Sequence, residues 1–145
     1  MLVTLSLDEA AETLAAQPFS TLVGARLTAF TDGAATLTIP IRPELLQQHG
    51  FVHGGVLSYA ADNALTFAAG SVLGPSIVTS GFSITYLRPA MGTALRAEAT
   101  AVSSGRRQAL CRCEIYADTE NGPVLCAAAQ GTASVIDLGR TATSA

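Results

Sequence analysis

Asp62 is the only acidic residue within a long apolar stretch that runs from Gly54 to Leu73. A carboxylate held among alanine and leucine side chains is partly desolvated, which makes it a stronger base. Such a group suits proton abstraction or direct attack on a carbonyl carbon. The alternatives are a carboxylate on a solvent-facing strip of the stretch, or one hydrogen-bonded for a structural purpose. Because few positions of the stretch are polar, we favour a catalytic role for Asp62.

A second candidate feature is the run from His49 to Gly55, which leads into the start of this stretch. Gly54 and Gly55 allow a ligand to approach the backbone closely, and the first N–H groups of a helix lack partners within it. Together with the helix dipole, these N–H groups suit a developing oxyanion. The alternative is a flexible turn with His53 near the helix cap. The residues alone leave both interpretations open.

The spacing of the two features limits how they can cooperate. Eight residues separate Gly54 from Asp62, which corresponds to about 12 Å along a helix axis. A base and an oxyanion donor must each lie within about 3 Å of one reacting carbonyl group. One helix cannot meet both conditions. If the site is catalytic, two antiparallel helices from two subunits must form it.

The surrounding pattern indicates which elements position these residues. A capping-box spacing at Ser6 predicts a short helix that Pro18 ends, and apolar residues around the whole circumference predict a buried helix from Gly54 to Leu73. Alternating or β-branched patterns predict strands over residues 22–30, 34–41, 77–87, 95–101, 109–117 and 124–136, with hairpin turns at Asp32-Gly33 and Asn121-Gly122. This order predicts an α+β fold, an antiparallel sheet curved around one central helix.

Composition excludes several classes of protein. The chain has 145 residues, a formal net charge of −3 and eight basic residues, all arginine, without a basic run, which argues against nucleic-acid binding. Asp62 and Asn63 interrupt the most apolar stretch, so no membrane association is expected. We see no secretory signal and expect a cytoplasmic protein. Cys111, Cys113 and Cys126 are expected to be small core residues, and no metal site is expected.

The motifs together resemble the PaaI-like family of hotdog-fold acyl-CoA thioesterases, which is associated with phenylacetic acid degradation. The resemblance is carried by His53-Gly54-Gly55, by Asp62 eight residues after Gly54, and by the segment from Ser83 to Pro89 that ends in Tyr-Leu-Arg-Pro. It extends from about Val23 to Ile136. It implies one hotdog domain over residues 1–145, with an N-terminal helix in residues 1–18 and a frayed tail at 139–145.

The resemblance also implies a reaction, a set of site residues and an assembly. It implies hydrolysis of an acyl-CoA substrate at the interface of a homodimer or of a dimer-of-dimers tetramer, with no cofactor beyond the coenzyme A of the substrate. Asp62 would be general base or nucleophile, and Gly54 of the partner subunit, beside His53, would polarise the carbonyl group. Gln47 would orient the carbonyl group or the water, and Thr66 would hold the attacking water. The residues assigned to substrate binding are Gly55, Thr79, Ser80, Arg88, Pro89, Gly105, Arg106 and Arg107.

Several alternatives remain at this level. The arginines could be ordinary solvated residues of turns, and either Thr79 or Ser80 could supply the helper hydroxyl. The chain could be a non-catalytic acyl-CoA-binding hotdog module or a hotdog enoyl-CoA hydratase. Sequence does not distinguish an aryl from a medium-chain acyl group.

Overall fold

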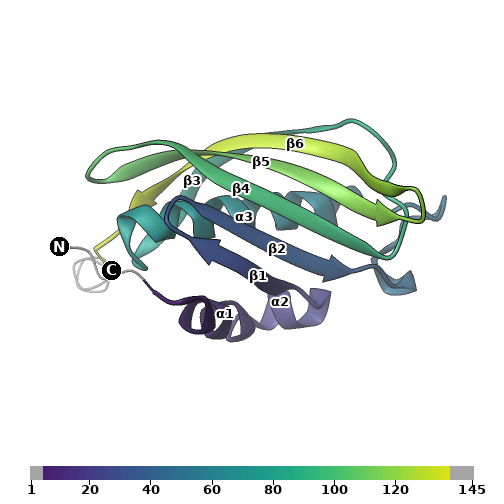
Figure 1. Ribbon diagram of the computed structural model, residues 1–145, viewed down its shortest axis with the longest axis horizontal. Helices are drawn as coiled ribbons and strands as arrows, with labels where there is room; N and C mark the ends of the chain where they lie inside the picture. The colour runs from purple at the N-terminus through teal and green to yellow at the C-terminus, as the bar shows by residue number, and fades with distance from the viewer. Residues whose placement is uncertain (1–4, 138–145) are drawn as a thin grey trace.

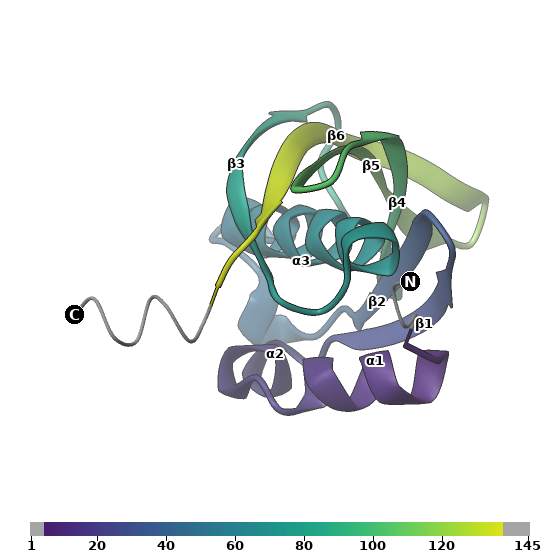
Figure 2. The same ribbon diagram turned by 90° about the vertical axis from the view of Figure 1, so that its left-hand side faces the viewer.

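One long helix, α3 (Gly54–Leu73), lies along the concave face of a six-stranded antiparallel sheet that curves around it (Figures 1 and 2). The structure is a computed structural model that describes residues 5–137. The order of strands across the sheet is β1-β2-β4-β5-β6-β3. The predicted α+β fold is confirmed. The strands are β1 (Arg26–Thr31), β2 (Ala34–Pro40), β3 (Ile77–Tyr86), β4 (Ala94–Ser104), β5 (Gln108–Thr119) and β6 (Gly122–Val135).

Small side chains allow α3 and the sheet to lie close together. On the helix, the side chains of Ala60, Ala61, Ala64, Ala68 and Ala69 are at most 1% exposed. The inner face of the sheet presents a similarly compact surface, because successive residues of a strand point to opposite faces. Its buried residues include Leu95, Ala97 and Ala99 on β4 and Ala109, Cys111, Cys113, Ile115 and Ala117 on β5. No helix among the described residues combines the length and apolar character needed to cross a membrane.

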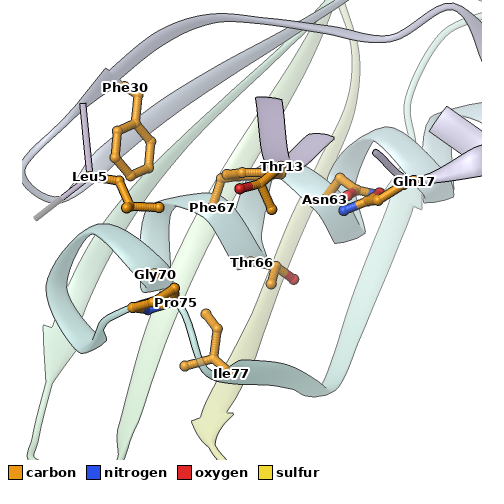
Figure 3. Close-up of a pocket in the computed structure, with 10 residues that line it drawn as sticks. All are labelled: Leu5, Thr13, Gln17, Phe30, Asn63, Thr66, Phe67, Gly70, Pro75 and Ile77. Carbon is orange, nitrogen blue, oxygen red and sulfur yellow. The ribbon is translucent and has the colours of Figure 1, made fainter. Parts of the chain in front are cut away.

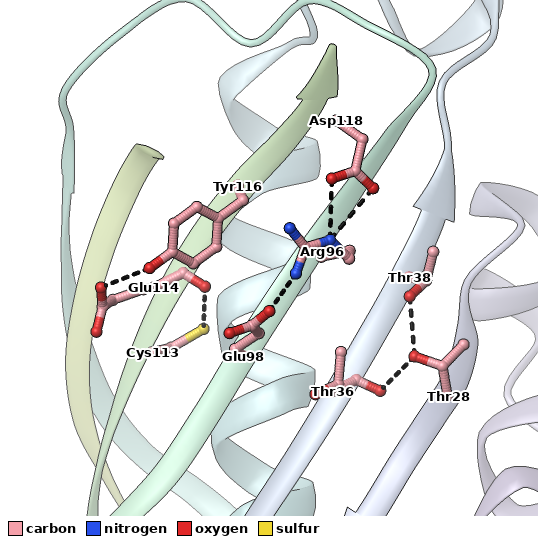
Figure 4. Close-up of polar contacts among 9 residues, drawn as sticks. All are labelled: Thr28, Thr36, Thr38, Arg96, Glu98, Cys113, Glu114, Tyr116 and Asp118. Atoms are coloured by element: carbon pink, nitrogen blue, oxygen red, sulfur yellow. Dashed lines mark hydrogen bonds and ion pairs between the residues drawn. The ribbon is translucent and has the colours of Figure 1, made fainter. Parts of the chain in front are cut away.

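The outer face of the sheet is polar, which explains the alternation seen in the sequence. Arg96 on β4 donates to Asp118 on β5 at 3.0 Å and also pairs with Glu98 (Figure 4). The Tyr116 hydroxyl donates to Glu114 at 3.0 Å. These polar side chains face solvent on the convex surface. The apolar core therefore lies on the concave side, between the sheet and the helix.

The N-terminal region departs from the sequence prediction. The first helix, α1 (Leu7–Ala15), has the predicted capping box at Ser6 but ends before Pro18. Pro18 instead begins a second helix, α2 (Pro18–Val23), because proline suits the first helical position, where its missing N–H needs no partner. Gly24, at φ +86°, ends α2, and the strand predicted from residue 22 starts at Arg26. The predicted tail at 139–145 lies outside the described residues.

The three cysteines are buried and unpaired, as predicted. Burial raises the pKa of the Cys111 thiol to about 11 and, with smaller contributions from Glu114 and Glu98, that of Cys113 to about 12. Burial also raises the pKa of Cys126. Because the thiolate is the reactive form, these groups are protected both by their pKa and by their lack of access to reagent.

We therefore expect no fast reaction between the native protein and Ellman's reagent at pH 8. Full reaction of the three thiols should follow unfolding in guanidinium chloride. Rapid modification of any thiol in the native state would contradict the burial described here. The same result would make Ellman's reagent suitable for following release of a thiol product by this protein.

Candidate active site

Asp62 lies halfway along α3, and its half-buried side chain points towards β3. The Thr79 hydroxyl donates to Asp62 Oδ1 at 2.6 Å, and Thr66 Oγ1 lies 2.6 Å from Thr79 Oγ1. Thr66 is one helical turn after Asp62 and also donates to the Asp62 carbonyl oxygen at 2.7 Å. Because Thr79 gives its proton to the carboxylate, the single proton of the Thr66 hydroxyl serves both the Asp62 carbonyl oxygen and the contact with Thr79. Three residues predicted separately are thus brought into one cluster.

The second carboxylate oxygen of this cluster is free. Within residues 5–137, Asp62 Oδ2 makes no hydrogen bond with the protein, whereas Oδ1 is held by Thr79. A carboxylate held by one oxygen keeps its orientation while the other oxygen can take a proton or attack a carbonyl carbon. The arrangement therefore suits either role predicted for Asp62.

Thr79 and Ser80 point to opposite sides of β3, because successive residues of a strand alternate. Ser80 is also the residue at which the register between β3 and β6 shifts. The exposed Ser80 hydroxyl lies 2.6 Å from Ser134 Oγ on β6. Of the two alternatives for a helper hydroxyl, Thr79 contacts Asp62 and Ser80 does not.

The start of α3 leaves one backbone N–H unpaired. His53 is the N-cap, and its Nδ1 accepts a hydrogen bond from the Gly55 N–H at 2.8 Å. The Val56 N–H bonds to the His53 carbonyl oxygen at 2.9 Å. In the described part of the chain, the Gly54 N–H has no partner and remains available to a ligand. Capping by His53 thus occupies the Gly55 N–H and leaves Gly54 as the candidate oxyanion donor.

Tyr86 contacts Gly54, and the sequence analysis assigned no role to Tyr86. Its hydroxyl donates to the Gly54 carbonyl oxygen at 2.9 Å and lies 2.8 Å from Ser58 Oγ. A Cβ added at Gly54 would lie 3.1 Å from the Tyr86 ring, so a larger residue there would require the ring to shift by a few tenths of an ångström. No local spacing could have indicated the contact, because Tyr86 lies 32 positions after Gly54 and 28 positions after Ser58.

A groove of about 330 Å³ opens at this end of the helix. The loop before α3, which includes the short 3-10 helix η1 (Pro43–Leu45), brings Gln47 to the groove. The Gln47 carbonyl oxygen Oε1 accepts a hydrogen bond from the His49 N–H, which fixes the side chain and leaves its NH₂ group free to donate. Arg88 and Pro89, which follow β3, line the same groove beside Gly54.

The second group of predicted arginines lies elsewhere. Gly105, Arg106 and Arg107 form the exposed turn between β4 and β5, and the Arg107 carbonyl oxygen accepts a bond from the Val135 N–H at 2.8 Å. This turn is at the end of the sheet near the C-terminal end of α3, opposite the groove (Figure 1). Within one chain, the structure therefore does not bring it together with Arg88.

Gly54 and Asp62 are also separate, as the spacing predicts. The helix runs from Gly54 to Leu73 as one element, so about 12 Å of rise lies between the free N–H and the carboxylate. One chain thus carries two candidate half-sites, the carboxylate cluster and the unpaired Gly54 N–H, that are too far apart to contact the same carbonyl group.

Comparisons with known proteins point to one family. The family model of the Thioesterase superfamily matches residues 49–124. A thioesterase family protein from Silicibacter pomeroyi is 29% identical, with a TM-score of 0.82 and coverage of 86% of this chain and 93% of that chain. A thioesterase from Haemophilus influenzae is 27% identical, with a TM-score of 0.80 and coverage of 95% and 96%. A variant of the phenylacetic acid degradation protein PaaI from Thermus thermophilus is 30% identical, with a TM-score of 0.72 and coverage of 83% and 100%.

The matched region contains both half-sites. Residues 49–124 include the cap at His53, the free N–H of Gly54 and the cluster of Asp62, Thr66 and Thr79. The similar structures extend the likeness over most of the chain, including the curved sheet and its central helix. The chain therefore belongs to the thioesterase superfamily, in which it is a PaaI-like hotdog thioesterase, a hydrolase of thioesters.

Proposed function

We propose that this protein hydrolyses the thioesters of coenzyme A with aryl or medium-chain acids. The observation that carries the proposal is the Asp62 carboxylate, with one oxygen held by Thr79 and the other free, on the same helix as the unpaired Gly54 N–H. Membership of the thioesterase superfamily supplies the reaction class. The products would be the free acid and coenzyme A, and no cofactor beyond that coenzyme takes part.

The proposed reaction divides the work between the two half-sites. As general base, Asp62 takes a proton from water while the water oxygen bonds to the thioester carbonyl carbon. The negative charge that develops on the carbonyl oxygen is stabilised by the Gly54 N–H and the start of α3. Collapse of the intermediate breaks the C–S bond, and the departing thiolate takes up the proton. As nucleophile, Asp62 would instead form a mixed anhydride, which water then hydrolyses.

We propose that two subunits supply these half-sites. Two antiparallel copies of α3 would place the Gly54 end of one helix beside the Asp62 of the other. Among the described strands, β3 pairs only with β6, which leaves its outer edge available to a second copy. The assembly would be a homodimer or a dimer of dimers. Gln47 and His53 would lie at the carbonyl group together with Gly54 of their own subunit.

A chain with a net charge of −3 needs local positive charge to bind the phosphates of coenzyme A. Arg88 and Pro89 line the groove at Gly54 and would hold the part of the coenzyme that is close to the thioester. The exposed turn of Gly105, Arg106 and Arg107 lies at the opposite end of the sheet within the same chain (Figure 1). An antiparallel partner would bring its own copy of this turn towards the groove, where it could bind a phosphate.

Incubation of the purified protein with phenylacetyl-, hexanoyl- and crotonyl-CoA tests the proposed function. We expect free thiol and free acid to appear in equal amounts from at least one of the saturated or aryl substrates. Calorimetric binding of all three without thiol release would instead identify an acyl-CoA-binding module. Loss of the enoyl absorbance of crotonyl-CoA without thiol release would identify a hydratase. Either result would overturn the proposal.

A further inference from the structure

Two consecutive peptide groups at the start of α3 are held by hydrogen bonds. The carbonyl oxygen of the first group, between His53 and Gly54, accepts a bond from the Val56 N–H at 2.9 Å. The second group joins Gly54 to Gly55 and is bound at both ends. The Tyr86 hydroxyl donates to its carbonyl oxygen at 2.9 Å, and its N–H donates to His53 Nδ1 at 2.8 Å. In the described part of the chain, the Gly54 N–H is the one group of the two that has no partner.

We propose that Tyr86 is a positioning residue for thioester hydrolysis, which together with His53 keeps the Gly54 N–H aligned with the carbonyl oxygen of the substrate. The inference rests on the proposed function and adds a residue to that same site. Tyr86 acts through the backbone of Gly54 and takes no part in the bonds that form and break. Its contribution is preorganisation, because a donor that is already aligned needs no rearrangement when negative charge develops.

The two neighbouring glycines explain why this backbone needs support. Glycine has the widest range of backbone conformations, and Gly54 and Gly55 lie at the end of a helix, where fewer hydrogen bonds hold the chain. Without further contacts, the first turn would fray and the direction of the Gly54 N–H would vary. A misplacement of about 1 Å at a reacting group can cost about 100-fold in rate. Tyr86 and His53 restrict the peptide group from opposite ends and so suppress this motion.

Ser58 completes the support from the helix itself. Its hydroxyl oxygen lies 2.8 Å from that of Tyr86, and Ser58 is the donor because Tyr86 gives its single proton to the Gly54 carbonyl oxygen. This bond directs the Tyr86 hydroxyl towards Gly54. Among the described residues, Tyr86 lines the groove at Gly54 and Ser58 does not. An effect of Ser58 on hydrolysis would therefore pass through Tyr86.

Strand β3 supports both half-sites. Near its start, Thr79 donates to Asp62 Oδ1 at 2.6 Å, beside a cavity of about 140 Å³ that Thr66 and Ile77 line (Figure 3). The last residue of β3 is Tyr86, whose hydroxyl reaches the start of α3. The strand and the helix thus run in opposite directions, with one hydroxyl of the strand at each half-site. Tyr86 holds the oxyanion donor as Thr79 holds the carboxylate.

Tyr86→Phe removes the hydroxyl and keeps the ring beside Gly54. For whichever of phenylacetyl- and hexanoyl-CoA the natural protein hydrolyses faster, we expect kcat to fall by about 10- to 100-fold. The value of KM should change by less than about threefold, because an aligned oxyanion donor acts mainly on the transition state. Tyr116→Phe is the matched control. Its hydroxyl bonds to Glu114 on the convex face of the sheet, so its loss should leave kcat unchanged.

Ser58→Ala tests whether the two hydroxyls act as a chain. Alanine favours the helix over serine, so folding should be preserved. We expect kcat to fall by about two- to fivefold in the natural protein and to stay unchanged in the Tyr86→Phe background, because residues that act through one contact are not additive. Ser58→Thr, which keeps the hydroxyl, should retain the natural kcat. A fully active Ser58→Ala protein beside an impaired Tyr86→Phe protein would indicate direct contact of Tyr86 with the substrate and overturn the positioning role.

A measurement of backbone motion keeps this inference separate from the proposed function. With ¹⁵N-labelled glycine, NMR relaxation of the substrate-free protein reports the motion of the Gly54 N–H. We expect an order parameter of about 0.85 in the natural protein and below about 0.6 in Tyr86→Phe. A loss of kcat without this change, or this change without a loss of kcat, would overturn the positioning role while leaving acyl-CoA hydrolysis intact. Absence of hydrolysis by the natural protein would overturn the two proposals together.

Discussion

Replacement of Asp62 by asparagine is expected to lower kcat by about 10²- to 10⁴-fold if the residue is a general base, and by more if it is the nucleophile. Asparagine has the same shape, and its carbonyl oxygen can still accept the bond from Thr79 that holds the natural side chain. The free position, which in Asp62 is Oδ2, becomes an NH₂ group that can neither take a proton nor attack a carbonyl carbon. Folding should therefore be preserved, and circular dichroism and the thermal midpoint check this.

The double variant Asp62→Asn/Asn63→Asp is a matched control for charge. It keeps the composition and net charge of the chain but moves the carboxylate one position along the helix, about 100° around its axis. We expect it to be as inactive as the single variant. Recovery of activity in the double variant would mean that negative charge in this region is sufficient, and near-normal turnover in a folded Asp62→Asn protein would remove Asp62 from the mechanism.

Mixing two inactive variants is expected to restore about a quarter of the natural activity. In one variant Asp62 is replaced by asparagine, and in the other Gly54 is replaced by valine. After joint unfolding and refolding, random pairing makes half of the dimers mixed, and each mixed dimer has one site with both defects and one intact site. The expected recovery follows from the 12 Å that one helix leaves between the two groups.

The valine variant needs its own control, because a Cβ at Gly54 would press against the Tyr86 ring at 3.1 Å. Each variant is therefore refolded alone, and subunit exchange is verified with an affinity tag on one chain. Mixed dimers that can be isolated through the tag but remain inactive would show that a single chain provides the complete site. Activity in either variant refolded alone would show that the substitution does not disable its half-site.

Local sequence signals account for most of the fold. The bounds of α3 could be predicted because glycines mark its start and Gly74-Pro75 follows its last residue. The strands could be predicted because inward and outward residues alternate. The prediction for the N-terminal region was wrong in part. Pro18 can either end one helix or begin another, and the choice depends on how α2 packs. Only the paired strands reveal the register shift at Ser80.

The site was predictable where its residues share one helix and less so where the sheet brings segments together. Asp62 and Thr66 are one turn apart, so their proximity is readable from spacing. The contact between Tyr86 and Gly54 joins residues 32 positions apart and depends on the pairing of β3 with the rest of the sheet. The separation of Arg88 from Arg106 and Arg107 likewise depends on strand order, which local patterns do not specify.

The alanine surface of α3 has a consequence for how such a protein diversifies. Where the helix meets the sheet, five alanine side chains of α3 are at most 1% exposed, so a larger residue at any of them would push the helix away from the sheet. That contact leaves little room for adaptive change. Helix α1 lies away from that contact, because it packs against β1 at the edge of the sheet. Substitutions that enlarge a side chain are therefore expected to be tolerated more readily on the exposed face of α1 than on the alanine face of α3.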